Sequence, residues 1–317
     1  MKPALSVIFF TTLAGTGYGM LLWAGVLGAA RALPAGVWFG PGAVLIALAL
    51  ASAGLLASTF HLGRPERGWR AISQWRSSWL SREGVAALLT YLPALAYAAA
   101  WGFAGQPAAI TRALGALSAV AAVVTVVCTG MIYASLKPIR QWRQPLVVPN
   151  YLLMAAFSGA ACLAAMALFW LPPAPARLVA TLAVLAGILA ALGKLRYWHA
   201  IDHGEPAATI ESATGLGRLG PVRMLDAPNT EENYLLREFA FRIGRKHATA
   251  LRWIALVLGF ALPVVLVAVG AALAGLPGRV LLPAGAACTF VGLFIERWLF
   301  FAQATHTVRL YYGEPRA

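Results

Sequence analysis

The sequence predicts an all-α polytopic membrane protein, a bundle of eight transmembrane helices with both termini in the cytoplasm. Two features of composition indicate this fold class: 60% of the residues are hydrophobic and 11% are charged, and the mean hydropathy is +0.74. So much apolar surface exceeds what one soluble core can bury. The third feature is a series of apolar runs, most of them close to the roughly 20 residues that a helix needs to cross a bilayer.

We count eight such runs and expect one helix from each, with Gly and Pro at most junctions. They cover 5–30, 40–60, 83–103, 113–135, 148–171, 177–194, 253–274 and 281–304. The first run is too long for the apolar region of a signal peptide and has no convincing cleavage site, so we expect it to remain as a helix. Residues 1–317 then form one integral membrane domain with a cytoplasmic loop at about 195–252.

The basic residues set the orientation. A net charge of +14 would suggest nucleic acid in a soluble protein, but here nearly all Lys and Arg fall on the side that holds the termini and the second, fourth and sixth loops. The opposite side has only Arg31, Arg112, Arg177 and Arg279. The positive-inside rule therefore predicts cytoplasmic termini in a bacterial inner membrane, with lipid and not nucleic acid as the surroundings.

The second loop, HLGRPERGWRAISQWRSSWLSREG, has an amphipathic helical pattern. Trp69, Ile72, Trp75 and Trp79 recur at spacings of three and four, with arginines elsewhere around the helix. Such a segment lies flat among the lipid headgroups with its indoles sunk. The alternative is an aromatic belt with positive-inside charge and no further role.

His61 and Glu83 are the candidate functional residues. His61 lies at the end of the second run and Glu83 at the start of the third, so a short loop brings both to the membrane edge. Ionisable groups at membrane depth are costly and indicate function. The alternative for Glu83 is a helix cap after Ser81.

Other ionisable residues have weaker claims. Glu296 and Arg297 are neighbours in the eighth run; we expect Glu296 to pair with another helix and Arg297 to snorkel outward. A bis-histidine haem is open only to His61 with His199, and neither is deep, so no haem is expected.

The three cysteines, Cys128, Cys162 and Cys288, lie inside runs without a paired motif. The chain therefore cannot hold its own cysteine-ligated iron–sulfur cluster or zinc, and no metal site is expected.

Three further motifs concern loops and packing. GLGRLG (215–220) matches a dinucleotide motif, but no predicted strand precedes it, so a tight turn is the better interpretation. Asn229 with Glu232 resembles a capping box before a cytoplasmic helix that could dock another subunit, a plain linker being the alternative. In GTGYG (15–19), Gly15 and Gly19 favour close helix packing over a ligand role.

Residues 58–84 and the eight-helix layout resemble the membrane anchor subunit of the dimethyl sulfoxide reductase type, the DmsC family. The resemblance implies a complex with a molybdopterin catalytic subunit and an iron–sulfur subunit that holds the [4Fe–4S] clusters. It also implies a haem-free anchor that reacts with quinone (ubiquinone or menaquinone) near the second loop. The family's histidine and glutamate fall on His61 and Glu83.

Residue chemistry agrees with this resemblance. Quinone reduction takes up two electrons and two protons, which suits an imidazole and a carboxylate at the membrane edge. Arg64 and Arg67 lie beside them and are candidates to hold the developing anion.

The loop at 195–252 is longer than we expect for the reductase anchors. In this respect it is more similar to the anchors of the sulfite dehydrogenase complexes, which belong to the same broad family. It therefore favours quinone reduction during cytoplasmic sulfite oxidation, with the partner subunits on the cytoplasmic face. An S- or N-oxide reductase that oxidises menaquinol is the alternative, and a polytopic transporter the alternative of another class.

Overall fold

The computed structural model describes residues 3–34, 36, 38–60, 62–105, 108–226, 246–273 and 275–312. Eight helices in it are long and apolar enough to cross a membrane, which confirms the predicted number of spans. They are α1 (Leu5–Ala29), α2 (Phe39–Thr59), α3 (Trp79–Ala104), α4 (Ala109–Ala134), α5 (Val147–Trp170), α6 (Pro173–His203), a seventh span at Ala248–Ala272, and α12 (Leu276–Ala302). Helices satisfy their own backbone hydrogen bonds, which the bilayer core requires.

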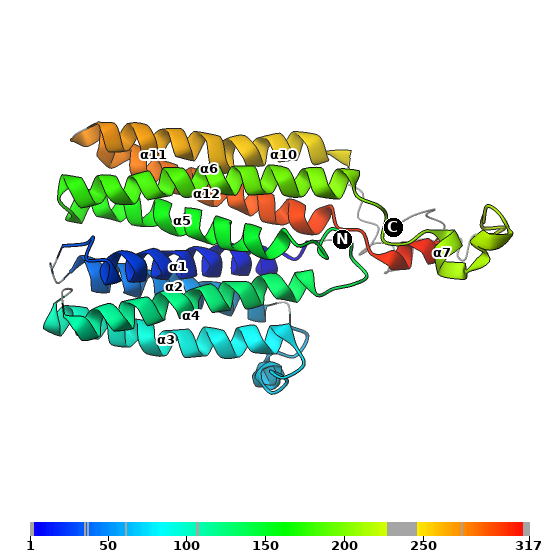
Figure 1. The fold of residues 1–317 in the computed structure, drawn as a ribbon, viewed down its shortest axis with the longest axis horizontal. Helices are drawn as coiled ribbons and strands as arrows, with labels where there is room; N and C mark the ends of the chain where they lie inside the picture. The colour runs from blue at the N-terminus through cyan, green and yellow to red at the C-terminus, as the bar shows by residue number, and fades with distance from the viewer. Residues whose placement is uncertain are drawn as a thin grey trace.

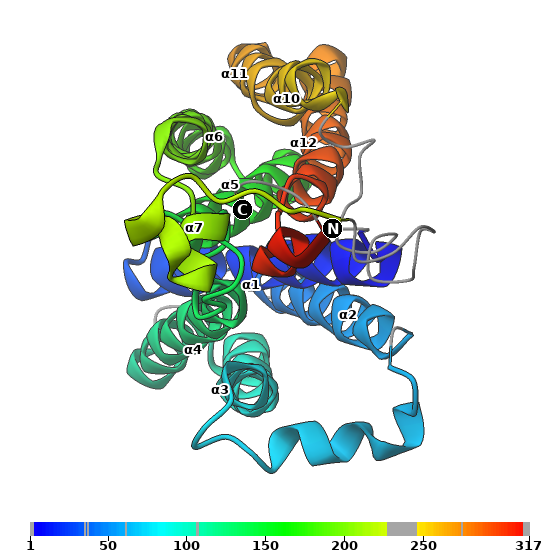
Figure 2. The same ribbon diagram turned by 90° about the vertical axis from the view of Figure 1, so that its right-hand side faces the viewer.

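The spans form two groups of four (Figures 1 and 2). In the first, α1 packs on α2 and α4, and α3 closes the ring by contacting both. In the second, α5, α6, α11 and α12 form a similar ring. The groups meet mainly where α1 packs on α5. The start of α1 and the short helix η4 (Thr307–Tyr312) lie at the same end of the bundle (Figure 1), which an even number of crossings requires.

Several helix boundaries differ from the sequence prediction, and α3 and α6 show the physical causes. Helix α3 begins at Trp79 because Ser78 is its N-cap, with its hydroxyl oxygen 3.5 Å from the backbone nitrogen of Ser81. Helix α6 continues to His203, well beyond residue 194. Tyr197, Trp198 and Ile201 give this extension a buried face. Hydropathy reports where the bilayer ends, whereas a helix continues for as long as it has a face to bury.

The seventh span changes its winding midway. It consists of α10 (Ala248–Leu256), a π-helical turn η3 (Val257–Ala261) and α11 (Leu262–Ala272). Pro263 has no N–H and its ring crowds the carbonyl of Gly259, so the wider turn relieves that clash. The same turn presents Gly259 to Gly292 of α12, where a Cβ on Gly292 would lie 2.0 Å from the Cα of Gly259.

The contact between α1 and α5 depends on glycine. A Cβ on Gly19 would lie 1.7 Å from the carbonyl oxygen of Ala155, and one on Gly159 would lie 2.1 Å from the carbonyl carbon of Gly19. The predicted packing role of Gly19 is thus confirmed. The same prediction is wrong for Gly15, because a Cβ there meets no atom within 4 Å.

This difference makes a matched pair of variants. Gly19→Ala is expected to lower the midpoint of thermal unfolding, because overpacking at a backbone contact costs about 1–3 kcal/mol or more. Gly15→Ala adds the same methyl group to the same helix and is expected to leave the midpoint unchanged. Fluorescence-monitored unfolding of the detergent-solubilised chain measures both. Equal midpoints for the two variants would show that α1 and α5 can move apart at Gly19 without loss of stability.

Candidate functional site

The connection between α2 and α3 lies across the outside of the bundle. It contains the 3-10 helix η1 (Pro65–Ile72), followed by a turn. Figure 1 shows η1 end-on beside α3, so its axis crosses the direction of the spans, and Figure 2 shows the connection running outside α3. The predicted single helical face through Trp79 is therefore wrong, because η1 stops at Ile72 and Trp79 already belongs to α3.

The arginines of this connection stack on its tryptophans. The Cζ of Arg70 lies 5.5 Å from the ring centroid of Trp69, and that of Arg76 lies 5.4 Å from the centroid of Trp75. The Cζ of Arg82 lies 4.3 Å from the centroid of Trp79. Trp69 and Trp75 are 68% and 52% exposed. Exposed indoles that carry guanidinium groups suit the boundary between lipid headgroups and acyl chains.

The structure does not assemble the predicted site as a unit. His61 lies outside the described residues. Arg64 and Arg67 are exposed on the connection. No ion pair joins either arginine to Glu83 within the described part of the chain.

Glu83 instead faces the bundle interior. It is 4% exposed, and its Oε1 accepts a 2.7 Å hydrogen bond from the hydroxyl of Thr129 on α4. Because Ser78 is the N-cap and Glu83 lies beyond the first turn of α3, the interpretation of Glu83 as a cap is wrong. A carboxylate bonded to a second helix is positioned for chemistry or for charge pairing.

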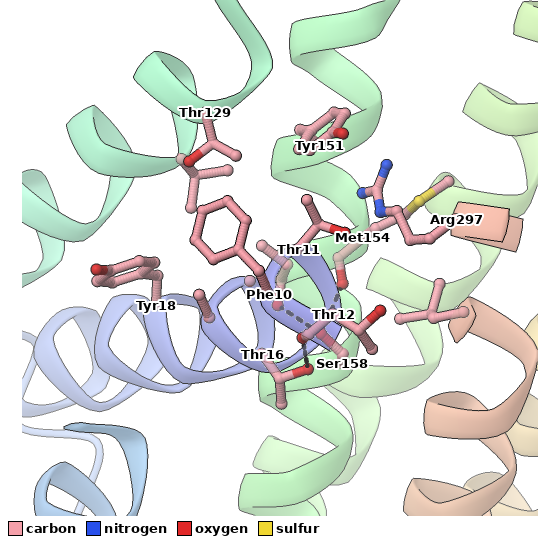
Figure 3. A pocket seen from close by; sticks show the side chains of 15 residues that line it. Phe10, Thr11, Thr12, Thr16, Tyr18, Thr129, Tyr151, Met154, Ser158 and Arg297 are labelled. Atoms are coloured by element: carbon pink, nitrogen blue, oxygen red, sulfur yellow. Dashed lines mark hydrogen bonds between the residues drawn. The ribbon is translucent and has the colours of Figure 1, made fainter. Parts of the chain in front are cut away.

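Thr129 is also part of the wall of a polar chamber between α1, α4, α5 and α12 (Figure 3). The chamber has a volume of about 20 Å³, which is enough for one water molecule and too small for an aromatic ring. Figure 3 shows Thr129 on one side of it, Arg297 beside Tyr151 on the other, and Phe10 of α1 between them. Buried hydroxyl groups from α1 and α5 supply the rest of its polar lining: Thr11, Thr12, Thr16, Tyr18 and Ser158.

A buried ion cluster continues from the chamber. Glu296 of α12 forms an ion pair with Lys194 of α6, and the two side chains are 0% and 2% exposed. The expectation that Glu296 pairs with another helix is confirmed. The Nε of Arg297 lies 3.7 Å from Oε2 of Glu296, and its Cζ lies 3.8 Å from the centroid of the Tyr151 ring. The prediction that Arg297 snorkels outward is wrong, because its side chain is 5% exposed.

Sequence reasoning missed Lys194. It stands at the predicted end of the sixth run, where it counts with the basic residues of the cytoplasmic loop. The signal was available, since Tyr197, Trp198 and Ile201 follow Lys194 at three, four and seven residues and share one helix face with it. The Nζ of Lys194 lies 4.2 Å from the Tyr197 ring centroid.

The described histidines and the cysteines take no part in the ion pairs of this interior cluster. His199 and His203 are exposed on the last turns of α6, with ring centroids 4.2 Å apart. Cys128, Cys162 and Cys288 are free thiols, and no group of three or more His, Cys, Asp or Glu suited to a metal occurs among the described residues. An iron–sulfur cluster needs several convergent thiolates, so these three separate cysteines do not fit one.

The described part of the loop after α6 reaches residue 226. Thr209 and Ser212 form a capping box at the start of α7 (Ile210–Thr214), and Gly215 ends that helix with φ 70°. GLGRLG thus forms the expected tight turn, since Gly220 also has positive φ. The predicted capping box at Asn229 and Glu232, and the helix after it, lie outside the described residues.

Together, the eight apolar helices, the ionisable interior and the interfacial connection define a polytopic membrane protein with a polar site inside its bundle. A family model described as DMSO reductase anchor subunit (DmsC) matches residues 1–303, and the chain belongs to this family. It is 38% identical to a sulfite dehydrogenase subunit of Allochromatium vinosum over 335 aligned positions, which cover 98% of this chain and 99% of that protein. The resemblance inferred from residues 58–84 is confirmed.

Proposed function

We propose that this chain is the quinone-reactive anchor subunit of a molybdopterin and iron–sulfur oxidoreductase that oxidises sulfite. Electrons pass from the [4Fe–4S] clusters of a partner subunit to quinone in the membrane. The similarity to the Allochromatium vinosum sulfite dehydrogenase subunit over nearly the whole of both chains supports this substrate. The clusters belong to the partner, because this chain's three separate cysteines do not fit one.

The observation that carries the quinone role is the placement of Glu83. Its carboxylate is buried between α3 and α4 and bonded to Thr129, directly below the connection that follows His61. When quinone is bound, it supplies a carbonyl oxygen that takes up protons on reduction. Glu83 exchanges one of these protons, and His61 donates a hydrogen bond to the oxygen.

Arg64 and Arg67 have a separate role in the proposal. Their guanidinium groups project from the connection and are free to turn toward an anion that forms at the quinone or toward acidic groups on a partner. The connection and the loop after α6 lie at the same end of the bundle (Figure 1), where most of the Lys and Arg are found. We therefore place the partner subunits at this end, on the cytoplasmic face of a bacterial inner membrane.

The anchor of an S- or N-oxide reductase is the second candidate, because the matching family model is described as that of a DMSO reductase. An anchor subunit does not touch the terminal substrate, so its own residues serve either direction of electron flow. A transporter has lost its support, since the family match covers nearly all of the chain.

The test is purification of the chain under mild detergent with the subunits that accompany it. We expect molybdenum, iron and sulfite-dependent reduction of a short-chain ubiquinone. Oxidation of menaquinol by dimethyl sulfoxide without sulfite activity would establish the second candidate. A stable, metal-free chain that purifies alone contradicts both.

A further inference from the structure

Two buried charges in this bundle have no adequate partner of their own. Glu83 is hydrogen-bonded to Thr129, but no Lys or Arg nitrogen forms an ion pair with it within the described part of the chain. Arg297 lies 3.7 Å from Glu296, which is already paired with Lys194. Taken as ionised, Lys194, Glu296 and Arg297 carry one positive charge in excess, and Glu83 carries one negative charge.

One of these charges lines the chamber, and the other is hydrogen-bonded to a residue that lines it. Arg297 lines it directly, and Thr129, which donates to Glu83, lines it from the opposite side (Figure 3). Tyr151 also lines the chamber, and the centroid of its ring lies 3.8 Å from the Cζ of Arg297. In a medium of low dielectric, opposite charges interact over much longer distances than they do in water.

The chamber itself is polar and large enough for water. The hydroxyl groups of Tyr18 and Thr12 belong to its lining, are buried, and have no hydrogen-bond partner among the described residues. One water molecule fits the volume of about 20 Å³ and satisfies such groups. The chamber therefore offers buried hydroxyl groups and room for one water molecule between Thr129 and Arg297, beside apolar lining residues that include Phe10.

We propose that Arg297, held by Glu296 and by the ring of Tyr151, is the counter-charge of Glu83 across this chamber. The Lys194–Glu296 pair fixes the guanidinium at the chamber wall, and the excess positive charge of the cluster keeps the carboxylate of Glu83 ionised. Arg297 is then a positioning residue that favours the ionised form of Glu83 between the proton exchanges assigned above to this carboxyl group. This functional consequence rests on the proposed function, whereas the charge coupling itself does not require quinone.

A double-mutant cycle tests the coupling. Thermal unfolding midpoints are measured for the detergent-solubilised full chain and for Glu83→Gln, Arg297→Met and the double variant. Arg297→Met leaves a buried carboxylate without its counter-charge and is expected to lower the midpoint. In the double variant only the Lys194–Glu296 pair, with no net charge, remains. The loss is therefore expected to recover by about half or more, because the effects of two sites that interact are not additive.

Two controls separate charge from packing. Arg297→Lys keeps the charge and is expected to lose less than Arg297→Met. Arg140 is a partly buried cation bonded to the carbonyl of Ile201, away from the chamber lining. Arg140→Met combined with Glu83→Gln is expected to be additive.

Each result of the cycle supports or rejects the coupling of Glu83 with Arg297. If Arg297→Met does not accumulate in the membrane, adding Glu83→Gln is expected to restore it. Additive losses, or no restoration, would overturn the proposal and show that Glu83 is neutral or compensated elsewhere. Intact coupling in a complex that lacks quinone activity would instead reject the proposed function alone.

Discussion

Replacing Lys194 by methionine is expected to cost about 3–5 kcal/mol of folding free energy, because it removes the ion-pair partner of a fully buried carboxylate. Glu296 is 0% exposed and cannot reach water. Arg297 remains 3.7 Å away and compensates only in part. The midpoint of thermal unfolding in detergent and the amount of chain in the membrane both measure the loss.

Lys137→Met is the matched control, because Lys137 is exposed at the end of α4. Exposed substitutions of this kind usually change stability by no more than about 0.5 kcal/mol. If the two methionine variants unfold at the same midpoint, Lys194 does not stabilise the fold and the ion pair is incidental.

Replacing Glu83 by glutamine is expected to slow sulfite-driven quinone reduction by about 100-fold or more, the effect of removing a proton-transfer group. The amide oxygen can still accept the hydrogen bond of Thr129, so the helix contact is preserved. Sulfite oxidation with a soluble electron acceptor bypasses the anchor and is expected to continue at the original rate. The two assays on one purified complex separate loss of quinone chemistry from loss of assembly.

Glu66 offers the control for this substitution. It lies in η1, is exposed, and belongs to the same connection. Glu66→Gln is expected to retain full quinone activity. An equal rate for Glu83→Gln and the original protein would show that Glu83 serves only to join α3 to α4.

Composition predicted the eight spans well, because burial in lipid needs only length and apolarity. It did not predict where α3 begins or where α6 ends. Trp79 begins α3 because Ser78 caps it, and α6 continues to His203 along a buried aromatic face. Both effects are local hydrogen bonding and packing, which a hydropathy window does not detect.

The candidate site was predicted in part. Glu83 was found because acids are rare in spans, but its partner Thr129 is one of many inconspicuous threonines. Arg297 was assigned to the interface because a long side chain near a helix end usually reaches water. In the structure, Glu296 and the face of Tyr151 hold it inside. The contacts of Glu83 with Thr129 and of Arg297 with Tyr151 join residues remote in sequence, which no local pattern reveals.

The pairing of Lys194 with Glu296 also has a consequence for biosynthesis. The residues of α6 before Lys194 contain Arg177 as their single charge, so this helix is apolar enough to enter the membrane early. Its partner is made roughly 100 residues later, which takes about 5–20 s at the usual rate of translation. During that interval Lys194 has to reach toward the headgroups or a membrane insertase. Its burial against Glu296 therefore marks the moment at which α12 has entered the membrane and packed against α6.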